Sequence, residues 1–150
     1  MASEISTAGI KLYYAVGTTQ PTIASITTEI PDITSLPEIG STPEGLECTP
    51  LSETVAKRYI PGLADPGSDF AITANDTTAF RTAWSGMITA LSTAAAGSKV
   101  WLKISIPNRD AFVISGVPNA LGFNGAEPNA VNQLVGHFTP NTVVGWVETT

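Results

Sequence analysis

Cys48 and His137 are the side chains of this 150-residue sequence that could act as a nucleophile and its general base. The sequence contains one cysteine and one histidine, so no other pair of this kind is available. A cysteine nucleophile needs a nearby base and surroundings that stabilise the thiolate. Nothing around Cys48 indicates such activation. We therefore interpret Cys48 as a small buried or half-buried thiol and His137 as a surface- or lumen-facing residue of a strand.

Metal and phosphate chemistry is no better supported by the residues present. A zinc site takes three or four protein ligands at suitable spacing, which one cysteine and one histidine do not supply. Asp65, Asp69 and Asp76 lack the D-x-[DN]-x-[DN]-G spacing of a calcium loop, and we assign them loop and helix-cap roles. The phosphate-binding patterns GxxxxGK[ST] and GxGxxG do not occur. The sequence predicts a protein that is not an enzyme and that uses no metal or other cofactor.

The composition indicates a surface that is partly covered by a partner. Hydrophobic residues make up 43% of the chain and charged residues 13%, about half of the ~25% that is usual for globular domains. The net charge of −6 does not favour electrostatic binding to nucleic acid. Since base-stacking platforms come with positive grooves, the aromatic residues fit core or interface positions better: Tyr13, Tyr14, Trp84, Trp101, Phe112 and Trp146.

The chain length and termini predict a single domain over residues 1–150. The first residues show no basic region followed by an apolar one, so we expect no signal peptide. No segment approaches the ~18–20 apolar residues of a membrane span, so we expect no membrane association. The lone cysteine excludes a disulfide within the chain and fits synthesis in a reducing cytoplasm.

Alternating apolar residues predict a chain made mainly of β-strands. The expected strands cover residues 10–16, 24–31, 46–51, 68–74, 99–107, 111–117, 131–139 and 143–148. Residues 108–110 read as a hairpin turn. Because strands and helices do not alternate, we expect an antiparallel β-sandwich or half-open barrel with one flanking α-helix.

The flanking helix is predicted by one apolar stripe with helical spacing. Asn75 or Asp76 is the expected N-cap. We expect the helix to extend over residues 94–96 and to end at Gly97. The residues of the stripe, which should face the core, are Phe80, Trp84, Met87, Ile88 and Leu91.

The stretch over residues 29–67 combines many prolines with recurrent apolar residues. Connections longer than about 12–15 residues without structure of their own are uncommon in compact domains and are usually functional. An apolar connection of this kind must cover its own sheet or a neighbouring subunit. Its first part is also acidic without any intervening base, which favours head-to-tail contact between copies. These acids are Glu29, Asp32, Glu38, Glu44, Glu47 and Glu53, and the nearest bases are Lys57 and Arg58.

Several segments, in order and with similar spacing, carry a family resemblance. They are STAGIKLYYAVGTT, the long stretch TTEIPDITSLPEIGSTPEGLECTPLSETVAKRYIPGLADPG, the helix, and the KVWLKISIP strand. The YIPGLADPG run (residues 59–67) and Leu46-Glu47-Cys48-Thr49 are the most specific parts. From Ser6 to about Phe138 the chain resembles the major tail tube proteins of long-tailed, non-contractile bacteriophages.

This resemblance implies a structural virion protein that self-assembles into hexameric rings. The inner strands would join into a barrel, and the stacked rings would form the conduit for DNA ejection. Partners would be further copies, tape-measure, initiator and tail terminator proteins, with double-stranded DNA only in transit. An N-terminal arm (about 1–8) would help stacking. A long loop (about 49–67) would contact an adjoining subunit or ring through Leu51, Val55, Tyr59, Ile60, Pro61, Gly62, Leu63 and Asp65.

Two alternatives remain open at this stage. The fold implied by the resemblance is shared with tube subunits of contractile injection and type VI secretion systems, which sequence separates poorly. From a different class, a carbohydrate-binding β-sandwich module would show exposed aromatic residues beside a cleft.

Overall fold

The computed structural model describes residues 9–40, 42–65, 67 and 69–148, so the expected N-terminal arm lies outside the described residues. The elements confirm a mainly β, antiparallel fold with one helix in the described part of the chain. In order they are β1 (Lys11–Gly17), the 3-10 helix η1 (Ile23–Ser25), β2 (Thr28–Ile30), β3 (Ile33–Ser35), β4 (Thr42–Glu47), β5 (Tyr59–Asp65), β6 (Phe70–Asn75), α1 (Thr78–Thr93), β7 (Lys99–Ser105), β8 (Ala111–Phe123) and β9 (Gln133–Val147).

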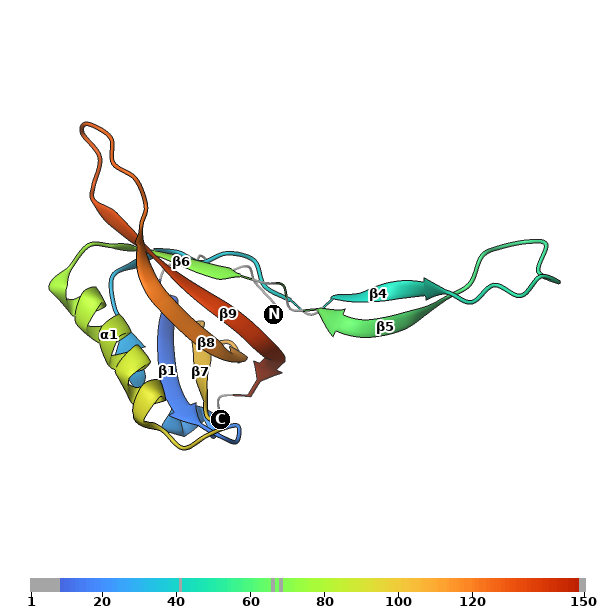
Figure 1. Ribbon diagram of the computed structural model, residues 1–150, viewed down its shortest axis with the longest axis horizontal. Coiled ribbons are helices and arrows are strands. Elements are labelled where there is room, and N and C mark those ends of the chain that lie inside the picture. Colours follow the sequence, from blue (N-terminus) through green and yellow to red (C-terminus); the bar gives the residue numbers. More distant parts are fainter. Residues whose placement is uncertain (1–8, 41, 66, 68, 149–150) are drawn as a thin grey trace.

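The body is one curled antiparallel sheet with the strand order β2-β1-β7-β8-β9-β6-β3 (Figure 1). Its two edge strands, β2 and β3, are separated in sequence by only Pro31 and Asp32. Since consecutive Cα atoms lie 3.8 Å apart, the two edges must lie close together, and the sheet curls into a half-open barrel. Asp32 makes the tight connection with a φ of 63°. Its carbonyl accepts from the Asn75 backbone N–H at 3.0 Å.

The long strands β8 and β9 bend and belong to both halves of the sheet. The first part of β8 pairs with β7, and the first part of β9 pairs with β6. Their mutual pairing shifts register at several points, including between Ser115 and Gly116. Bulges of this kind let a strand pass from one layer to another. A Cβ at Gly116 would lie 2.1 Å from the Thr139 carbonyl oxygen, so the crossing requires glycine.

The predicted break between strands 131–139 and 143–148 was wrong, as was the end of a strand at residue 117. Pro140 lies within β9 beyond the last residue paired with β6, so its missing N–H costs no ladder bond on that side. Pro118 likewise continues β8 opposite Phe138. The predicted strand over 24–31 is shorter, because residues 23–25 form η1.

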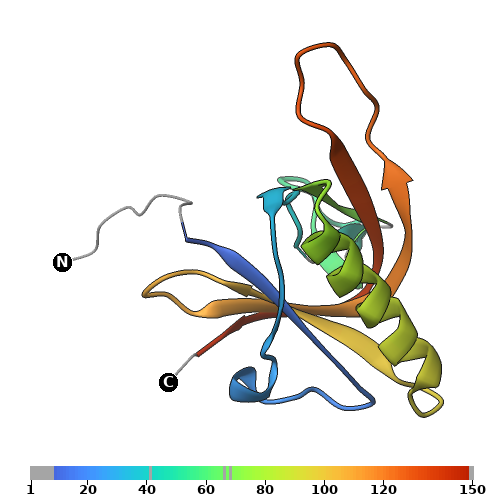
Figure 2. The same ribbon diagram turned by 90° about the vertical axis from the view of Figure 1, so that its left-hand side faces the viewer.

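Helix α1 lies across one face of the sheet and closes the core (Figure 2). Phe80, Trp84 and Met87 are fully buried, and Ile88 and Leu91 are half-buried against the same cluster. The Trp84 indole N–H donates to the Asn119 carbonyl at 2.8 Å. Its ring lies directly on the backbone of Gly136, where a Cβ would come within 2.7 Å.

The ends of α1 differ from the prediction. Thr77 is the N-cap, and its hydroxyl accepts from the Phe80 backbone N–H at 3.1 Å. Asp76 instead forms an ion pair with Arg81 at 2.5 Å, and the hydrogen bonds from Arg81 hold the pKa of Asp76 below its ordinary value. The helix ends at Thr93 rather than extending over residues 94–96. Gly97 has a φ of 86° in the turn that follows.

A second, smaller cluster of Ile26, Trp101 and Val113 covers the opposite face of the sheet. Lys103 lies at its margin, with its Nζ 4.7 Å from the centroid of the Tyr13 ring. The same Nζ donates to the Ile23 carbonyl at 3.3 Å, and burial lowers the pKa of Lys103. Both faces of this half of the sheet are therefore packed.

Candidate assembly interface

Strands β4 and β5 form a hairpin that projects from the body, and we call residues 42–65 the arm (Figure 1). The two strands make a separate sheet. Leu46 lies opposite Ile60 and Glu47 opposite Tyr59, with a register shift between Pro43 and Gly45. The predicted strand over residues 46–51 was therefore misplaced. Part of the predicted loop over 49–67 is strand β5, and residues 48–58 form the tip.

Glu53 holds the tip of the arm together. Its Oε1 accepts from the backbone N–H groups of Val55 at 3.0 Å and Thr54 at 3.2 Å, and its Oε2 accepts from the Arg58 guanidinium at 2.7 Å. The Arg58 backbone N–H donates to the Thr49 hydroxyl at 2.7 Å. The hydrogen bond from Val55, followed by that from Arg58, lowers the pKa of Glu53. The tip thus has a defined shape without contacting the body.

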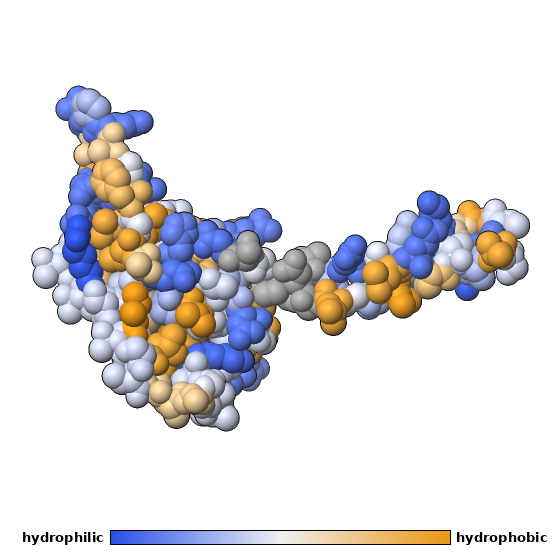
Figure 3. Space-filling model, in the orientation of Figure 1, coloured by the Kyte–Doolittle hydropathy of each residue, from blue (hydrophilic) through white to orange (hydrophobic). Residues whose placement is uncertain are grey.

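The apolar side chains of the arm point into solvent. Leu51 is 106% exposed, Leu63 92% and Val55 90%. In Figure 3, hydrophobic and hydrophilic residues alternate along the whole projection. Leu46, Tyr59 and Ile60 are exposed by about half. A two-stranded hairpin is marginally stable in water by itself, and several large apolar side chains exposed on one element indicate an interaction site. The arm therefore has the properties of a segment that is covered by a partner.

The structure gathers most of the predicted contact residues on this arm. Leu51, Val55, Tyr59, Ile60, Pro61 and Leu63 are exposed there. Gly62 is half-buried, and a Cβ at this position would meet the Leu46 side chain and the Glu44 carbonyl. Asp65 is the last residue of β5, opposite Thr42. Sequence reasoning omitted Leu46, although its cross-strand position beside Ile60 places it on the same surface.

The last part of β9 offers a second feature suited to assembly. From Thr139 to Val147, β9 pairs with β8 on one side and with no described strand on the other. Trp146 is 60% exposed there and meets the Phe112 ring edge-on at 5.1 Å. An unpaired strand edge is a template for pairing with another chain. The sequence showed the aromatic residues but not this open edge.

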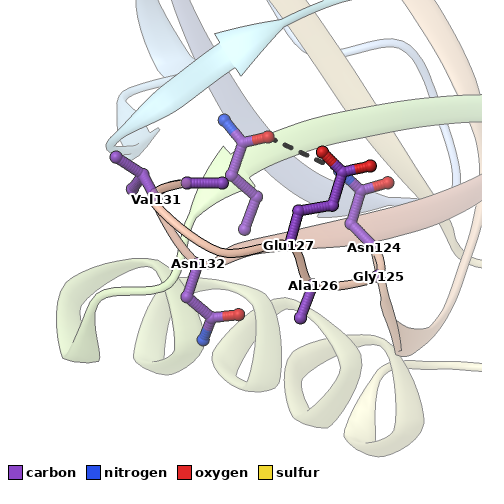
Figure 4. A pocket seen from close by; sticks show the side chains of 8 residues that line it. Asn124, Gly125, Ala126, Glu127, Val131 and Asn132 are labelled. Atoms are coloured by element: carbon purple, nitrogen blue, oxygen red, sulfur yellow. Dashed lines mark hydrogen bonds between the residues drawn. The ribbon is translucent and has the colours of Figure 1, made fainter.

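The loop between β8 and β9 forms a third projection (Figure 1), whose lining residues Figure 4 shows from close by; the sequence had indicated only a break here. It encloses a pocket of about 400 Å³ lined by residues 124–127 and 130–133. Asn124 Nδ2 donates to Gln133 Oε1 at 3.5 Å, and Asn132 Nδ2 donates to Asp76 Oδ2 at 2.7 Å. Phe123 and Val131 are exposed at its base. The loop is thus tied to the body by the Asp76 contact.

The residues with possible catalytic chemistry are not brought together. The prediction that Cys48 is buried or half-buried was wrong, because it lies exposed on the arm, where its backbone N–H donates to the Arg58 carbonyl at 2.9 Å. His137 lies in β9 on the body, where its Nδ1 is 2.9 Å from Asp69 Oδ2. Within the described residues, no three His, Cys, Asp or Glu side chains are placed to hold a metal ion. No described helix is long and apolar enough to cross a membrane.

The fold is found in solved structures of a baseplate and of a particle tail. The chain is similar to one in the cryo-EM structure of the anti-feeding prophage baseplate, which was 6-fold symmetrised, with a TM-score of 0.69 and 8% identity over 100% of this chain and 99% of that chain. It is also similar to a chain in the tail of an empty GTA particle with C6 symmetry, with a TM-score of 0.56 and 11% identity over 94% of each chain. No protein-family model and no curated protein matches the sequence.

Proposed function

We propose that this protein is a structural virion protein whose hexameric rings stack into the tail tube of a phage, the conduit for genome ejection. The observation that carries this proposal is the arm, a preformed hairpin whose apolar side chains have no cover within the described chain. The similar chains come from particles described with six-fold symmetry. Their match over nearly the full length supports a single domain in which the arm is an integral part.

The arrangement of surfaces favours head-to-tail assembly. The arm and the open edge of β9 are different surfaces of one subunit, so contact between them is heterologous. Such contacts close into a ring when the rotation divides a full turn, and they extend into a filament when it does not. Covering the arm and pairing the edge would remove two surfaces that otherwise invite aggregation. Ring closure and stacking would therefore cover the exposed arm and pair the open edge of β9 that the isolated subunit presents.

The partners that this function requires are mostly further copies of the chain. Tape-measure, initiator and tail terminator proteins would meet the two ends of the tube and its interior. Double-stranded DNA would pass through without specific binding, because a net charge of −6 repels phosphates at the distances of about 8 Å over which charges act in physiological salt. The assembled protein would reside in the tail of the virion after synthesis in the host cytoplasm.

A contractile injection system is the second candidate. The similarity to a chain of the anti-feeding prophage baseplate has the higher TM-score of the two, 0.69 against 0.56. In such a particle the same fold would form an inner tube or a baseplate ring. Co-purification of a sheath protein from the native source would favour this machine over a non-contractile tail.

Electron microscopy of the concentrated purified protein tests the proposal directly. We expect rings or tubes of uniform width in negative stain. Replacing the arm residues 43–64 by a short Gly-Ser linker should leave a folded monomer that forms neither, because the arm pairs only with itself. A wild-type protein that stays monomeric at high concentration, even with initiator and tape-measure proteins present, would refute the proposal.

A further inference from the structure

A small cleft opens where the two edges of the curled sheet meet. It has a volume of about 220 Å³ and lies between β1, β2 and β3. Leu12, Ile30, Ile33 and Leu36 give it an apolar lining, and Glu29 and Asp32 supply carboxylates at its rim. One water occupies about 30 Å³ in the liquid, so the cleft has room for one or two aliphatic side chains.

The walls of the cleft are held in place by contacts to the body. Asp32 Oδ2 accepts from the Thr77 hydroxyl at 2.6 Å, and its carbonyl accepts from Asn75. Leu12 and Ile30 are opposite each other in the β1–β2 ladder and form the nearly fully buried floor of the cleft, and the half-buried Ile33 and Leu36 provide its accessible apolar wall. The cleft is therefore preformed, and filling it would not require the sheet to rearrange.

The rim of the cleft carries a net negative charge. Lys11 lies 3.9 Å from Glu29 and offsets one of the two carboxylates. The second carboxylate, that of Asp32, accepts only from a neutral hydroxyl among the described contacts. A ligand that combines aliphatic groups with one positive charge would complement this site.

The arm tip has those properties. Leu51 and Val55 are two aliphatic side chains held in solvent by the Glu53 hydrogen bonds. Glu53 and Arg58 neutralise each other in their ion pair. Lys57 is exposed beside them and makes no ion pair with any residue that the structure describes. The tip thus presents an apolar pair with one uncompensated positive charge.

We propose that the cleft between β2 and β3 receives the arm tip of a second copy, with Leu51 and Val55 entering the cleft and Lys57 facing Glu29 and Asp32. This inference rests on the proposed function, because it requires contact between copies. The tip and the cleft are different surfaces of one subunit, so the contact is head-to-tail and repeats from copy to copy. The arm cannot be filling its own cleft, since Leu51 is 106% exposed in the single chain.

Site-directed disulfide formation tests the contact. In a Cys48→Ser background, one preparation carries Val55→Cys and a second carries Leu36→Cys. Mixing them under mild oxidation should give disulfide-linked dimers that a reductant converts back to single chains. The matched control pairs Val55→Cys with Val131→Cys, an exposed aliphatic position on the β8–β9 loop, and should give no more cross-linking than single-cysteine preparations.

A charge exchange tests the electrostatic part. Lys57→Glu should weaken association about 3- to 10-fold in physiological salt, the range expected for an exposed ion pair replaced by a like-charge contact. Combining it with Glu29→Lys should restore at least half of the lost affinity on a logarithmic scale. Sedimentation velocity measures both variants, and additivity of the two single effects would contradict the pairing.

The outcomes separate this inference from the proposed function. If wild type forms rings but Val55→Cys and Leu36→Cys cross-link no better than the control, the cleft is not the docking site and the tube function stands. If the cross-link forms but microscopy shows only irregular oligomers, the docking stands and the tube function fails. A wild-type protein that never associates overturns both.

Discussion

Replacing the two most exposed aliphatic side chains of the arm tip, Leu51→Ser with Val55→Ser, should strongly weaken assembly without affecting the fold. Leu51 is 106% exposed and Val55 90% exposed in the single chain, so nearly their whole surface is available for burial in a contact. Burying one aliphatic side chain contributes about 1.5–3 kcal/mol. Loss of both from one contact therefore costs about 3–6 kcal/mol. At about 1.4 kcal/mol per factor of ten, association should weaken at least about 100-fold.

Two measurements check this prediction. Sedimentation velocity over a concentration series gives the association constant of wild type and variant. Urea unfolding followed by tryptophan fluorescence gives the free energy of unfolding of the body, to which Trp84 belongs. Exposed substitutions usually change this free energy by within about 0.5 kcal/mol. Ala56→Ser, also exposed on the tip, is the matched control and should associate like wild type.

Two results would refute the reasoning. If the double variant associates within about threefold of wild type, these side chains stay exposed in the assembly, because their burial would cost far more. If the variant instead loses more than about 1 kcal/mol of unfolding free energy, well above the usual effect of an exposed site, the arm packs on its own body in solution. The second result would make the arm part of the core rather than of an interface.

Three further predictions concern the tip and the core. The pKa of Glu53 is lowered from its ordinary value of 4.5 in the folded arm. The stability that ionised Glu53 gives the tip is therefore present above that value and is lost as the pH falls through the lowered pKa. Assembly followed by light scattering should weaken below about pH 4.5, and Glu53→Gln should weaken it already at pH 7; an unchanged pH profile in Glu53→Gln would show that another carboxylate is responsible. Gly136→Ala should destabilise the body by about 1–3 kcal/mol, because its Cβ would lie 2.7 Å from the Trp84 ring. The control Gly40→Ala, whose Cβ would have nothing within 4 Å, should not destabilise it. Equal melting temperatures of the two variants would contradict the packing of Trp84. Trp84→Phe should lower the free energy of unfolding by about 2–4 kcal/mol, because the buried ring is smaller and the hydrogen bond to Asn119 is lost. Thermal unfolding followed by circular dichroism measures this, and a loss below about 1 kcal/mol would show that the core closes over the gap.

The helix shows what local pattern can and cannot predict. Phe80, Trp84 and Met87 follow the helical period, which depends only on neighbouring residues, and all three are buried. The cap was misassigned because Asn75 and Asp76 have partners from distant segments. Asn75 is paired with Gln133 in the β6–β9 ladder, and the Asp76 carboxylate accepts from the Asn132 side chain. Such competition is decided by tertiary contacts and has no local signal.

The arm likewise has one property that the local sequence predicts and one that depends on contacts between distant residues. The recurrent apolar residues of 29–67 predicted a segment that needs cover, since exposed apolar surface is unfavourable wherever it lies. The pairing of Leu46 with Ile60 across the tip was not predicted. Prolines argue against central strands, and here Pro43 and Pro61 are accommodated beside the register shift of a hairpin that pairs with no third strand.

The sequence by itself determined the class of fold, because periods of two and of 3.6 residues report which side of each element is apolar. It also determined where uncovered apolar surface would gather, in the segment that became the arm. Only the tertiary structure decided that β8 and β9 each continue past their prolines, because Gly116 lets the strands cross where any side chain would strike the Thr139 carbonyl. It also decided that the sheet edges meet at Asp32 and leave a cleft there. Pairing between distant segments creates these features, and no local stretch of sequence contains them.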